Sequence, residues 1–378
     1  MRILIVGAGI GGSTLAALLE GRGHMVDLIE RSPDFSKAGY AVSLWPLGSR
    51  ILIGLGLIEG FRAIANPLVT YRLRNGAGHD ITTYELSQKI AVHGDTGTLS
   101  RKDLLGLLQS KLRQTRLRMG TKVQTLTQTA DEVTVTFDDQ SEAIYDLVVG
   151  ADGIGSSIRH LIAGEVKAHE TGWGGWVWWA PKDVVPATDV TEYWGAGRFL
   201  GLYPCADQVC AFAGGPLTNE PQNRHLGAQE IRAHFEAIVP TLPAVFDALP
   251  DDASEIFFWK LDDVRSPVWS KGRVVLLGDA ATAFLPTAGV GASNAMESAA
   301  VLADELLRVE AHTVERALRL FEKRHRQRVQ TAQQESRNLA KVMFVSSSPL
   351  AWARDELMKH YPVEQFVSGI MKSLDEPM

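Results

Sequence analysis

Residues 3–12 read ILIVGAGIGG: four apolar residues lead directly into the spaced glycines Gly7, Gly9 and Gly12. When G-x-G-x-x-G lies between a strand and a helix, the glycines permit a tight turn, let backbone approach a pyrophosphate and let the helix pack closely on the strand. A helix that begins near Gly12 would direct its free N–H groups at the phosphates. The stretch therefore predicts a Rossmann-like unit that binds a dinucleotide.

A carboxylate follows at a suitable distance. Glu30 ends the second apolar run, residues 25–29, and lies 18 residues after Gly12. An acidic side chain at this place accepts hydrogen bonds from a ribose 2′-hydroxyl. The first motif and Glu30 predict nucleotide binding but leave both NAD(P) and FAD open.

A later motif favours FAD. Residues 273–277 read RVVLL, a strand that would deliver Gly278 and Asp279 to the end of a sheet. A carboxylate there can accept hydrogen bonds from the ribityl chain of a flavin, which NAD lacks. Pro286 and a glycine-containing loop then lead into a helix expected at about residues 292–307, whose N-terminus can stabilise negative charge on a reduced isoalloxazine ring.

In their order and spacing, the motifs resemble those of the group A flavoprotein monooxygenases, the family around p-hydroxybenzoate hydroxylase. The resemblance spans roughly residues 1–340 and includes the Asp152-Gly153 motif after the apolar run 147–149 and the S-R-K-D-L-L run of residues 100–105. It implies an α/β fold. A Rossmann-like FAD-binding domain of the p-hydroxybenzoate hydroxylase (GR2) type would carry an inserted, mostly antiparallel β-sheet substrate domain and C-terminal helices.

The motifs and the resemblance together predict the residues that hold noncovalent FAD. They are Gly9, Gly11, Gly12, Glu30, Arg31, Ser43, Arg101, Val123, Asp152, Asp279, Pro286, Gly289, Val290, Gly291, Ala292 and Ser293. The resemblance implies that Asp152 helps with both the pyrophosphate and NAD(P)H. The chain departs from the family pattern at Thr282, where many relatives have histidine.

Changes in composition along the chain predict a discontinuous division. Residues 1–68, 91–171 and 261–345 would form the FAD-binding domain, residues 69–90 and 172–260 the substrate-binding domain, and residues 346–378 C-terminal helices. In residues 122–150, alternating apolar and polar side chains predict antiparallel strands. Residues 172–260 are rich in aromatic and turn residues, and we expect them to form a sheet over the flavin.

The resemblance implies the reaction. NADH or NADPH binds transiently and reduces FAD, O2 adds at flavin C4a, and the hydroperoxide hydroxylates a small aromatic or heteroaromatic substrate. The candidates for the substrate pocket are Trp178, Arg198, Tyr203, Phe212 and Phe284. Strand alternation places Trp176 and Trp178 on one face and Trp179 on the other, so that one of the two faces meets the pocket. No residue is assigned as a catalytic acid or base.

Composition excludes several other classes. A net charge of −6 and a pI near 6.0 argue against binding to nucleic acid or acidic membranes. Two cysteines provide no metal-ligand cluster, and no apolar stretch is long enough to span a bilayer. We expect a cytoplasmic enzyme that is a monomer or a homodimer and binds no metal.

Other functions on the same scaffold stay open. Trp176, Trp178 and Pro181 match part of the W-x-W-x-I-P signature of flavin-dependent halogenases, but no lysine lies between Lys37 and Lys89 to direct hypohalous acid. A flavin-dependent reductase of prenyl double bonds is a second alternative. A protein that holds flavin and a ligand without turnover is a third.

Overall fold

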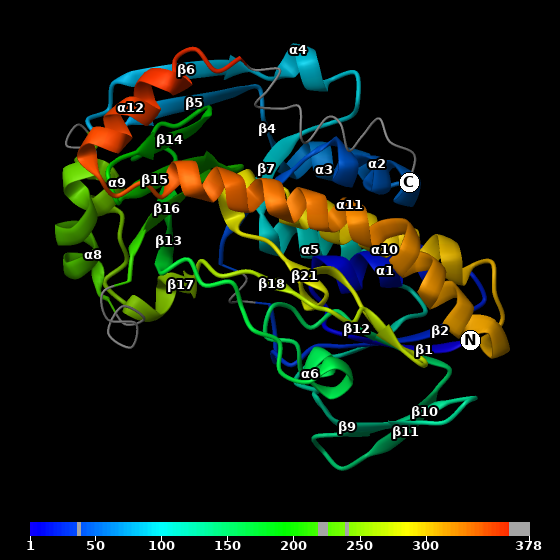
Figure 1. Cartoon of the computed structure of the whole chain (residues 1–378). Coiled ribbons are helices and arrows are strands. Elements are labelled where there is room, and N and C mark those ends of the chain that lie inside the picture. The colour runs from blue at the N-terminus through cyan, green and yellow to red at the C-terminus, as the bar shows by residue number, and fades with distance from the viewer. Residues whose placement is uncertain (36–38, 218–225, 239–241, 363–378) are drawn as a thin grey trace.

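The computed structural model describes residues 1–35, 39–217, 226–238 and 242–362 of the chain. Within these residues the strands form two large sheets and three small ones. Figure 1 shows the two large sheets in different halves of the molecule, with a long helix, α11 (Val314–Met343), running from one half to the other.

The first large sheet has the strand order β19-β20-β12-β1-β2-β8. Its strands are β1 (Arg2–Val6), β2 (Met25–Ile29), β8 (Arg116–Arg118), β12 (Leu147–Gly150), β19 (Ser270–Lys271) and β20 (Val274–Leu276). β1, β12 and β20 run in parallel, and their side chains are almost all buried, because both faces of the sheet are covered. The carboxyl ends of these three strands bring Gly7, Asp152 and Asp279 to one edge.

Different layers cover the two faces of this sheet. Helices α1 (Ile10–Leu19), α5 (Arg101–Gln109) and α10 (Gly291–Leu306) pack together on one side. On the other side lie α6 (Ser157–Ala163) and a small antiparallel sheet of β9 (Val123–Gln128), β10 (Val133–Phe137) and β11 (Glu142–Tyr145) (Figure 1).

The prediction of antiparallel strands in residues 122–150 is correct for β9, β10 and β11. The last run divides at Asp146, and residues 147–150 become β12, which pairs in parallel with β1. All four of those residues are buried, whereas β10 alternates between buried and partly exposed positions and β9 and β11 have one buried residue each. A short continuous apolar run belongs in a sheet that is covered on both faces.

The second large sheet has the order β17-β13-β16-β15-β14-β5-β6. Its strands are β5 (Thr70–Asn75), β6 (Asp80–Glu85), β13 (Trp173–Pro181), β14 (Val190–Trp194), β15 (Phe199–Pro204), β16 (Gln208–Pro216) and β17 (Phe257–Lys260). All neighbouring pairs are antiparallel except β14 and β5, which are parallel. This sheet confirms the predicted fold class, an α/β chain with an inserted, mostly antiparallel sheet.

The second sheet has two buried faces. Its outer face packs on α8 (Ala228–Phe235) and α9 (Pro243–Asp247) around Trp176 and Trp178. Its inner face turns toward the first half of the molecule and contributes Val177, Phe199 and Phe212 to a separate cluster that also contains Trp45 and Val290. That face is therefore the one that can meet a bound cofactor.

Shorter elements connect the two halves. β3 (Ala41–Leu44), β7 (Gly97–Ser100) and β4 (Asn66–Pro67) form a small sheet in that order. The other short elements are α2 (Pro46–Leu55), α3 (Ile58–Ile64), α4 (Ser87–Ile90), β18 (Val264–Arg265) and β21 (Thr282–Ala283). β18 pairs with β21, and so links the chain that returns from the second sheet to the strand after Asp279.

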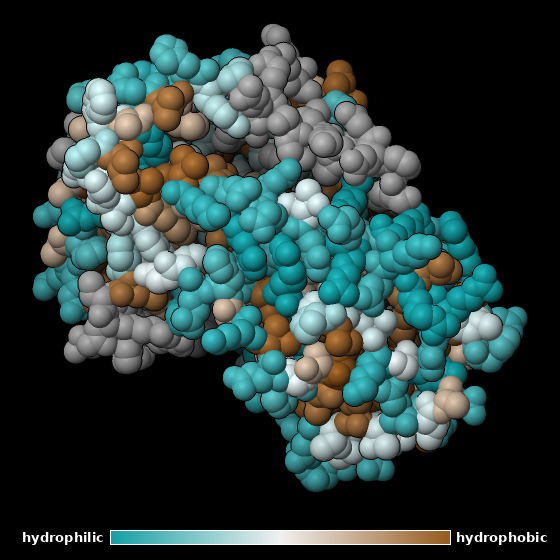
Figure 2. All heavy atoms as spheres, viewed as in Figure 1, coloured by the Kyte–Doolittle hydropathy of each residue, from teal (hydrophilic) through white to brown (hydrophobic). Residues whose placement is uncertain are grey.

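The C-terminal helices fasten the halves together. At the end of α11, the ring of Phe344 stacks on Trp173 with centroids 4.2 Å apart. In α12 (Ser348–Met358), Arg354 donates to the carbonyl of Trp194 at 2.9 Å. The outward side of α11 is a hydrophilic band in Figure 2, and several cations of this helix pair with acids, for example Arg326 with Glu322. Residues 363–378, the rest of the predicted C-terminal helices, lie outside the described residues.

Candidate active site

The turn after β1 contains two glycines that the fold itself requires. Gly7 has φ +107°, and a Cβ there would lie 2.4 Å from the carbonyl oxygen of Ala151. A Cβ on Gly12 would lie 2.0 Å from the carbonyl oxygen of Gly7. No side chain tolerates such contacts, so this turn forms only with glycine at both positions. Helix α1 begins at Ile10 rather than near Gly12 as predicted, because Gly9 takes the N-cap position.

Gly9 is different, because the protein leaves room beside it. Within 4 Å, a Cβ at Gly9 would meet only a terminal guanidinium nitrogen of Arg101, at 3.8 Å. The first turn of α1, which includes Gly11 and Gly12, has no side-chain cap. An open space bounded by an uncapped helix N-terminus and a guanidinium group fits a pyrophosphate.

Glu30 holds the other side of the turn. Its Oε2 accepts a hydrogen bond from the backbone N–H of Ala8 at 3.0 Å, and its Oε1 accepts one from Ser32 at 3.0 Å. Each carboxylate oxygen keeps further acceptor capacity, and the side chain is only partly buried, so ribose hydroxyls can still donate to it. Arg31 is exposed beside it, and Val123, at the start of β9, is buried.

Asp279 lies in a short 3₁₀ turn, residues 278–280, directly after the strand β20. Solvent reaches its carboxyl group, but the protein around it raises the pKa to about 6, and the charge of Arg101 opposes this rise. Arg101 also lies over the ring of Tyr40, with its guanidinium carbon 5.7 Å from the ring centroid. Arg101 is thus near both Gly9 and Asp279, the predicted pyrophosphate and ribityl positions.

The loop before α10 is fastened to the start of α2. It contains the turn of residues 286–288 and Gly289, which has φ +62°. Trp45 donates its indole N–H to the carbonyl of Gly289 and its backbone N–H to Oγ of Ser293, both at 3.1 Å. Ser293 is buried and its hydroxyl accepts that hydrogen bond, so its contact with FAD stays a prediction. A Cβ on Gly289 would lie 3.7 Å from Cβ of Ser43, which brings β3 to the same loop.

The remaining loop residues of the prediction surround this contact. Pro286, Gly291 and Ala292 are partly exposed, and Val290 is buried against the inner-face cluster.

Asp152 caps helix α6. Its carboxylate accepts hydrogen bonds from the backbone N–H groups of Ser157 at 2.7 Å and Ile158 at 3.1 Å, and from the hydroxyls of Ser156 and Ser157. A Cβ on Gly7 would lie 2.9 Å from Cα of Asp152, so the backbone of this motif borders the glycine turn. The structure gives Asp152 a capping role, and its contacts with pyrophosphate and NAD(P)H stay predictions.

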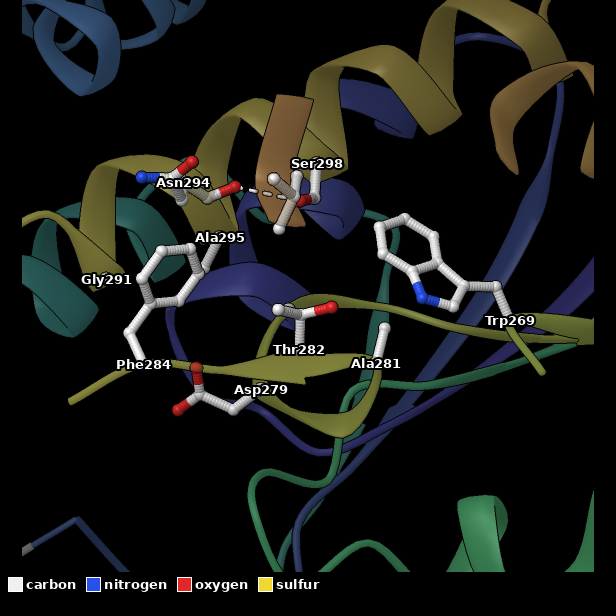
Figure 3. A pocket seen from close by; sticks show the side chains of 11 residues that line it. Trp269, Asp279, Ala281, Thr282, Phe284, Gly291, Asn294, Ala295 and Ser298 are labelled. Carbon is white, nitrogen blue, oxygen red and sulfur yellow. Dashed lines mark hydrogen bonds between the residues drawn. The ribbon is translucent and has the colours of Figure 1, made fainter. Parts of the chain in front are cut away.

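A small cavity lies behind Asp279 (Figure 3). Its volume of about 10 Å³ suits one water molecule. The hydroxyl of Thr282 and the indole N–H of Trp269 line it, and neither has a hydrogen-bond partner within the described part of the chain. Beside the cavity, Oγ of Ser298 lies 2.8 Å from Nε2 of His325, whose pKa burial lowers to about 3. Thr282, where the sequence departs from the family pattern, therefore has a hydroxyl without a partner among the described residues.

Three of the pocket candidates lie around the inner face of the second sheet. Tyr203 in β15 and Phe212 in β16 are on this face, and Phe284 packs against the same cluster from the flavin side. The ring of Phe212 is 5.1 Å from that of Trp259. The inner face is therefore aromatic, as predicted for a cover over the flavin.

The other two pocket candidates are not on that face. Trp178 is fully buried on the outer face, where its indole N–H donates to the carbonyl of Val245 at 2.9 Å. Its assignment to the pocket is wrong, because α8 and α9 cover that side of the strand and Trp179 takes the inner side. Arg198 lies in the turn between β14 and β15, and its charge adds to burial in lowering the pKa of His234 on α8. We therefore place Arg198 at the sheet edge beside α8.

Sequence reasoning missed several residues of the site. The ring of Tyr40 lies 5.3 Å from Phe257 and 5.2 Å from Trp259, and so joins the Arg101 side to the second sheet. Glu192 is buried on the inner face, and Tyr71 donates to it from β5. A single acid within the apolar strand 190–194 was the signal that could have singled it out.

Two further searches concern the described ranges only. None of their helices combines the length and the apolarity that a membrane span needs. No group of three or more His, Cys, Asp or Glu side chains among them is arranged to hold a metal ion.

The fold and the site are those of an FAD-dependent oxidoreductase, because a dinucleotide-type glycine turn, the strand-end carboxylate of Asp279 and an aromatic sheet lie around Arg101 and Tyr40. Residues 1–336 match the family model described as FAD binding domain. The chain belongs to this family and is a group A flavoprotein monooxygenase, as its motifs predicted.

Individual relatives agree over nearly the whole chain. It is 29% identical to the 3-amino-4-hydroxybenzoate 2-monooxygenase of Streptomyces cremeus, covering 95% of this chain and 92% of that protein. It is also 29% identical to the 6-hydroxynicotinate 3-monooxygenase of Bordetella bronchiseptica, covering 89% and 90%. The crystal structure of Klebsiella pneumoniae HpxO with FAD and uric acid superposes with a TM-score of 0.88 at 25% identity, over 99% of this chain and 96% of that one.

Proposed function

We propose that this monooxygenase hydroxylates a small aromatic or heteroaromatic ring held between the flavin site and the inner face of the second sheet. NADH or NADPH would reduce the bound FAD, which then supplies the oxygen-transfer chemistry with O2. The protein residues position the cofactor, orient the substrate and exclude water.

One observation carries the proposal: Tyr40 joins the cofactor side to the aromatic face. Arg101 lies over its ring, and Asp279 influences the ionisation of the same phenol. On its other side, Tyr40 contacts Phe257 and Trp259 of the second sheet. A ring bound beside these side chains would lie next to the cofactor and between apolar walls, as small-molecule sites require.

The proposed residue roles follow from position. The α1 N-terminus and Arg101 would hold the pyrophosphate, Glu30 the ribose, and Asp279 the ribityl hydroxyls. The loop of residues 286–293 would border the isoalloxazine ring. The inner face, with Tyr203 and Phe212, would hold the substrate. The relatives' names do not favour a halogenase, a prenyl reductase or a passive flavin binder.

The test is oxygen insertion by the purified holoenzyme. Phenols and hydroxylated N-heterocycles are screened for stimulated oxidation of NADH and NADPH, and mass spectrometry detects products heavier by one oxygen. We expect one ring class to stimulate consumption and to gain one oxygen. A flavin that neither nicotinamide reduces under anaerobic conditions would contradict the proposal. A cytoplasmic location and a monomeric or dimeric state stay predictions.

A further inference from the structure

The inner face of the second sheet carries one buried carboxylate, Glu192 in β14, which is 7% exposed. Its Oε2 accepts hydrogen bonds from the hydroxyl of Tyr71 at 2.6 Å and from the indole N–H of Trp194 at 2.9 Å. Its Oε1 accepts one from the hydroxyl of Tyr203 at 2.8 Å. Three donors that converge on two oxygens form the surroundings of an ionised carboxylate.

A glycine makes room for this arrangement. Gly201 faces Glu192 across the β14–β15 pair, two residues before Tyr203 on the same face. A Cβ on Gly201 would lie 2.6 Å from the ring and the hydroxyl oxygen of Tyr203. The tyrosine ring therefore lies flat over Gly201 and reaches sideways to Glu192.

No described cation balances Glu192. It has no ion pair among the described residues, and burial raises its pKa above the ordinary value, although its three hydrogen bonds oppose this rise. None of the side chains that share this face of strands β13 to β17 is lysine or arginine. Arg101 lies beside Tyr40 and Asp279, and Arg354, which lies over the ring of Trp194, pairs with Asp355. A second negative charge beside Glu192 would meet repulsion in surroundings of low dielectric constant.

Tyr203 has a fixed role in hydrogen bonding. It is the partly exposed member of the cluster, and it gives its only phenolic proton to Glu192. Toward a bound molecule its oxygen can therefore only accept.

We propose that the substrate presents a neutral N–H or O–H group to Tyr203 and carries no carboxylate at that edge, so that Glu192 selects neutral hydroxylated rings against aromatic acids. This proposal rests on the function proposed above and names its substrate class. It separates this chain from the two relatives above, whose names specify carboxylated rings.

The test uses matched ligands that differ by one carboxylate. They are 2-hydroxypyridine against 6-hydroxynicotinate, and 4-hydroxyquinoline against 4-hydroxyquinoline-2-carboxylate. Each is titrated into the oxidised holoenzyme while the flavin absorbance is followed, which requires no turnover. For at least one pair we expect the neutral ring to bind about tenfold more tightly or better, and Glu192→Gln to bring the two affinities close together. Tyr203→Phe should weaken the neutral ring several-fold without rescuing the acid.

Tyr193→Phe is the matched control. Tyr193 follows Glu192 in β14 but lies on the outer face, so this variant should leave the affinities for the neutral ring and the acid unchanged. If Glu192→Gln fails to hold FAD, the proposal is judged by two other results: the ratio of the wild-type affinities for the neutral ring and the acid, and the effect of Tyr203→Phe on each affinity. The proposal is overturned if the acids bind as tightly as the neutral rings, if Glu192→Gln folds and leaves the ratio unchanged, or if no neutral ring perturbs the flavin. Failure of the proposed function would look different: rings would bind selectively, yet none would gain oxygen.

Discussion

At the scale of single residues, Asp279 and Thr282 show how surroundings give ordinary side chains unusual properties. Asp279 has a raised pKa because protein encloses it on several sides, and only Arg101 offers a compensating charge. Thr282 is buried with an unpartnered hydroxyl, which is costly unless a water molecule completes its hydrogen bonds. Both line the small cavity described above.

Asp279 should make FAD binding depend on pH. Its pKa is raised from 3.8 to about 6, so the carboxyl is ionised above that pH and protonated below it. Since the ionised form is the better acceptor for ribityl hydroxyls, we expect FAD affinity to fall as the pH drops from 7 to 5. Asp279→Asn should lose affinity on the order of 1.5–3 kcal/mol at pH 7 and show a flatter pH profile. FAD fluorescence measures both.

The control for this experiment is Asp251→Asn, at an exposed aspartate far along the sequence. It should bind FAD like the parent at every pH. Parental affinity in Asp279→Asn would show that Asp279 does not hold the cofactor.

The cavity behind Asp279 should contain one ordered water bonded to Thr282 and Trp269. Thr282→Val has nearly the same shape and removes the hydroxyl, so it should cost about 1 kcal/mol of unfolding free energy by depriving that water of a partner. Denaturant unfolding and a high-resolution crystal structure test this. A dry cavity together with a neutral or stabilising valine would contradict it.

At the scale of elements, the β1–α1 turn separates what the fold requires from what the ligand requires. Gly7 and Gly12 are fixed by contacts with neighbouring backbone, whereas Gly9 borders open space. The same sequence motif thus combines a folding requirement with a binding requirement.

Two alanine variants should separate these requirements. Gly12→Ala should destabilise the apoprotein by several kcal/mol, because its Cβ would overlap the carbonyl oxygen of Gly7. Gly9 has an extended backbone (φ −70°, ψ −174°), which alanine also adopts. Gly9→Ala should therefore change apoprotein stability by less than about 1 kcal/mol while FAD binding is lost. Thermal unfolding of apoprotein and FAD titration measure the two effects. Normal FAD binding by Gly9→Ala would show that the pyrophosphate does not bind at this turn.

At the scale of the whole molecule, α11 is fastened where the chain enters and leaves the second sheet. The backbones of His169 and Asp263 form two hydrogen bonds, from His169 N–H to the Asp263 carbonyl at 2.8 Å and from Asp263 N–H to the His169 carbonyl at 3.2 Å. These bonds join the two crossing segments. The fully buried carboxylate of Asp263 accepts hydrogen bonds from Nε and Nη2 of Arg337 on α11, the first at 2.7 Å. This contact therefore ties both halves to one helix.

Arg337→Ala should lower the unfolding free energy by about 3 kcal/mol, because it leaves the Asp263 carboxylate buried without its cation. Thermal unfolding followed by far-ultraviolet circular dichroism should show a clearly lower midpoint. Arg319→Ala on the same helix is the control: its pair with Glu315 is exposed at 3.6 Å and should contribute at most about 0.5 kcal/mol. Equal effects of the two variants would contradict the role given to Arg337.

The sequence alone determined the fold class, the FAD-binding motifs and the family. Each of these depends on local patterns: a glycine turn after an apolar strand, a carboxylate after a strand end, and periodic alternation of side chains. Neighbouring residues impose such local geometry, so the glycine turn at Gly7 and Gly12 and the position of Asp279 at the end of a strand could be predicted without a structure.

Tertiary structure decided the details that depend on contacts between distant segments. Alternation showed that Trp178 and Trp179 face opposite ways, but only the packing of α8 and α9 decided which face lies inside. β12 pairs with β1 rather than with β9 to β11, because its four apolar residues are buried in a sheet that is covered on both faces. Glu192 became a buried acceptor only when β5 and β15 brought Tyr71 and Tyr203 to it. Pairings across so many residues leave no local signal, because they are set by the burial of whole surfaces rather than by the conformation of neighbouring residues.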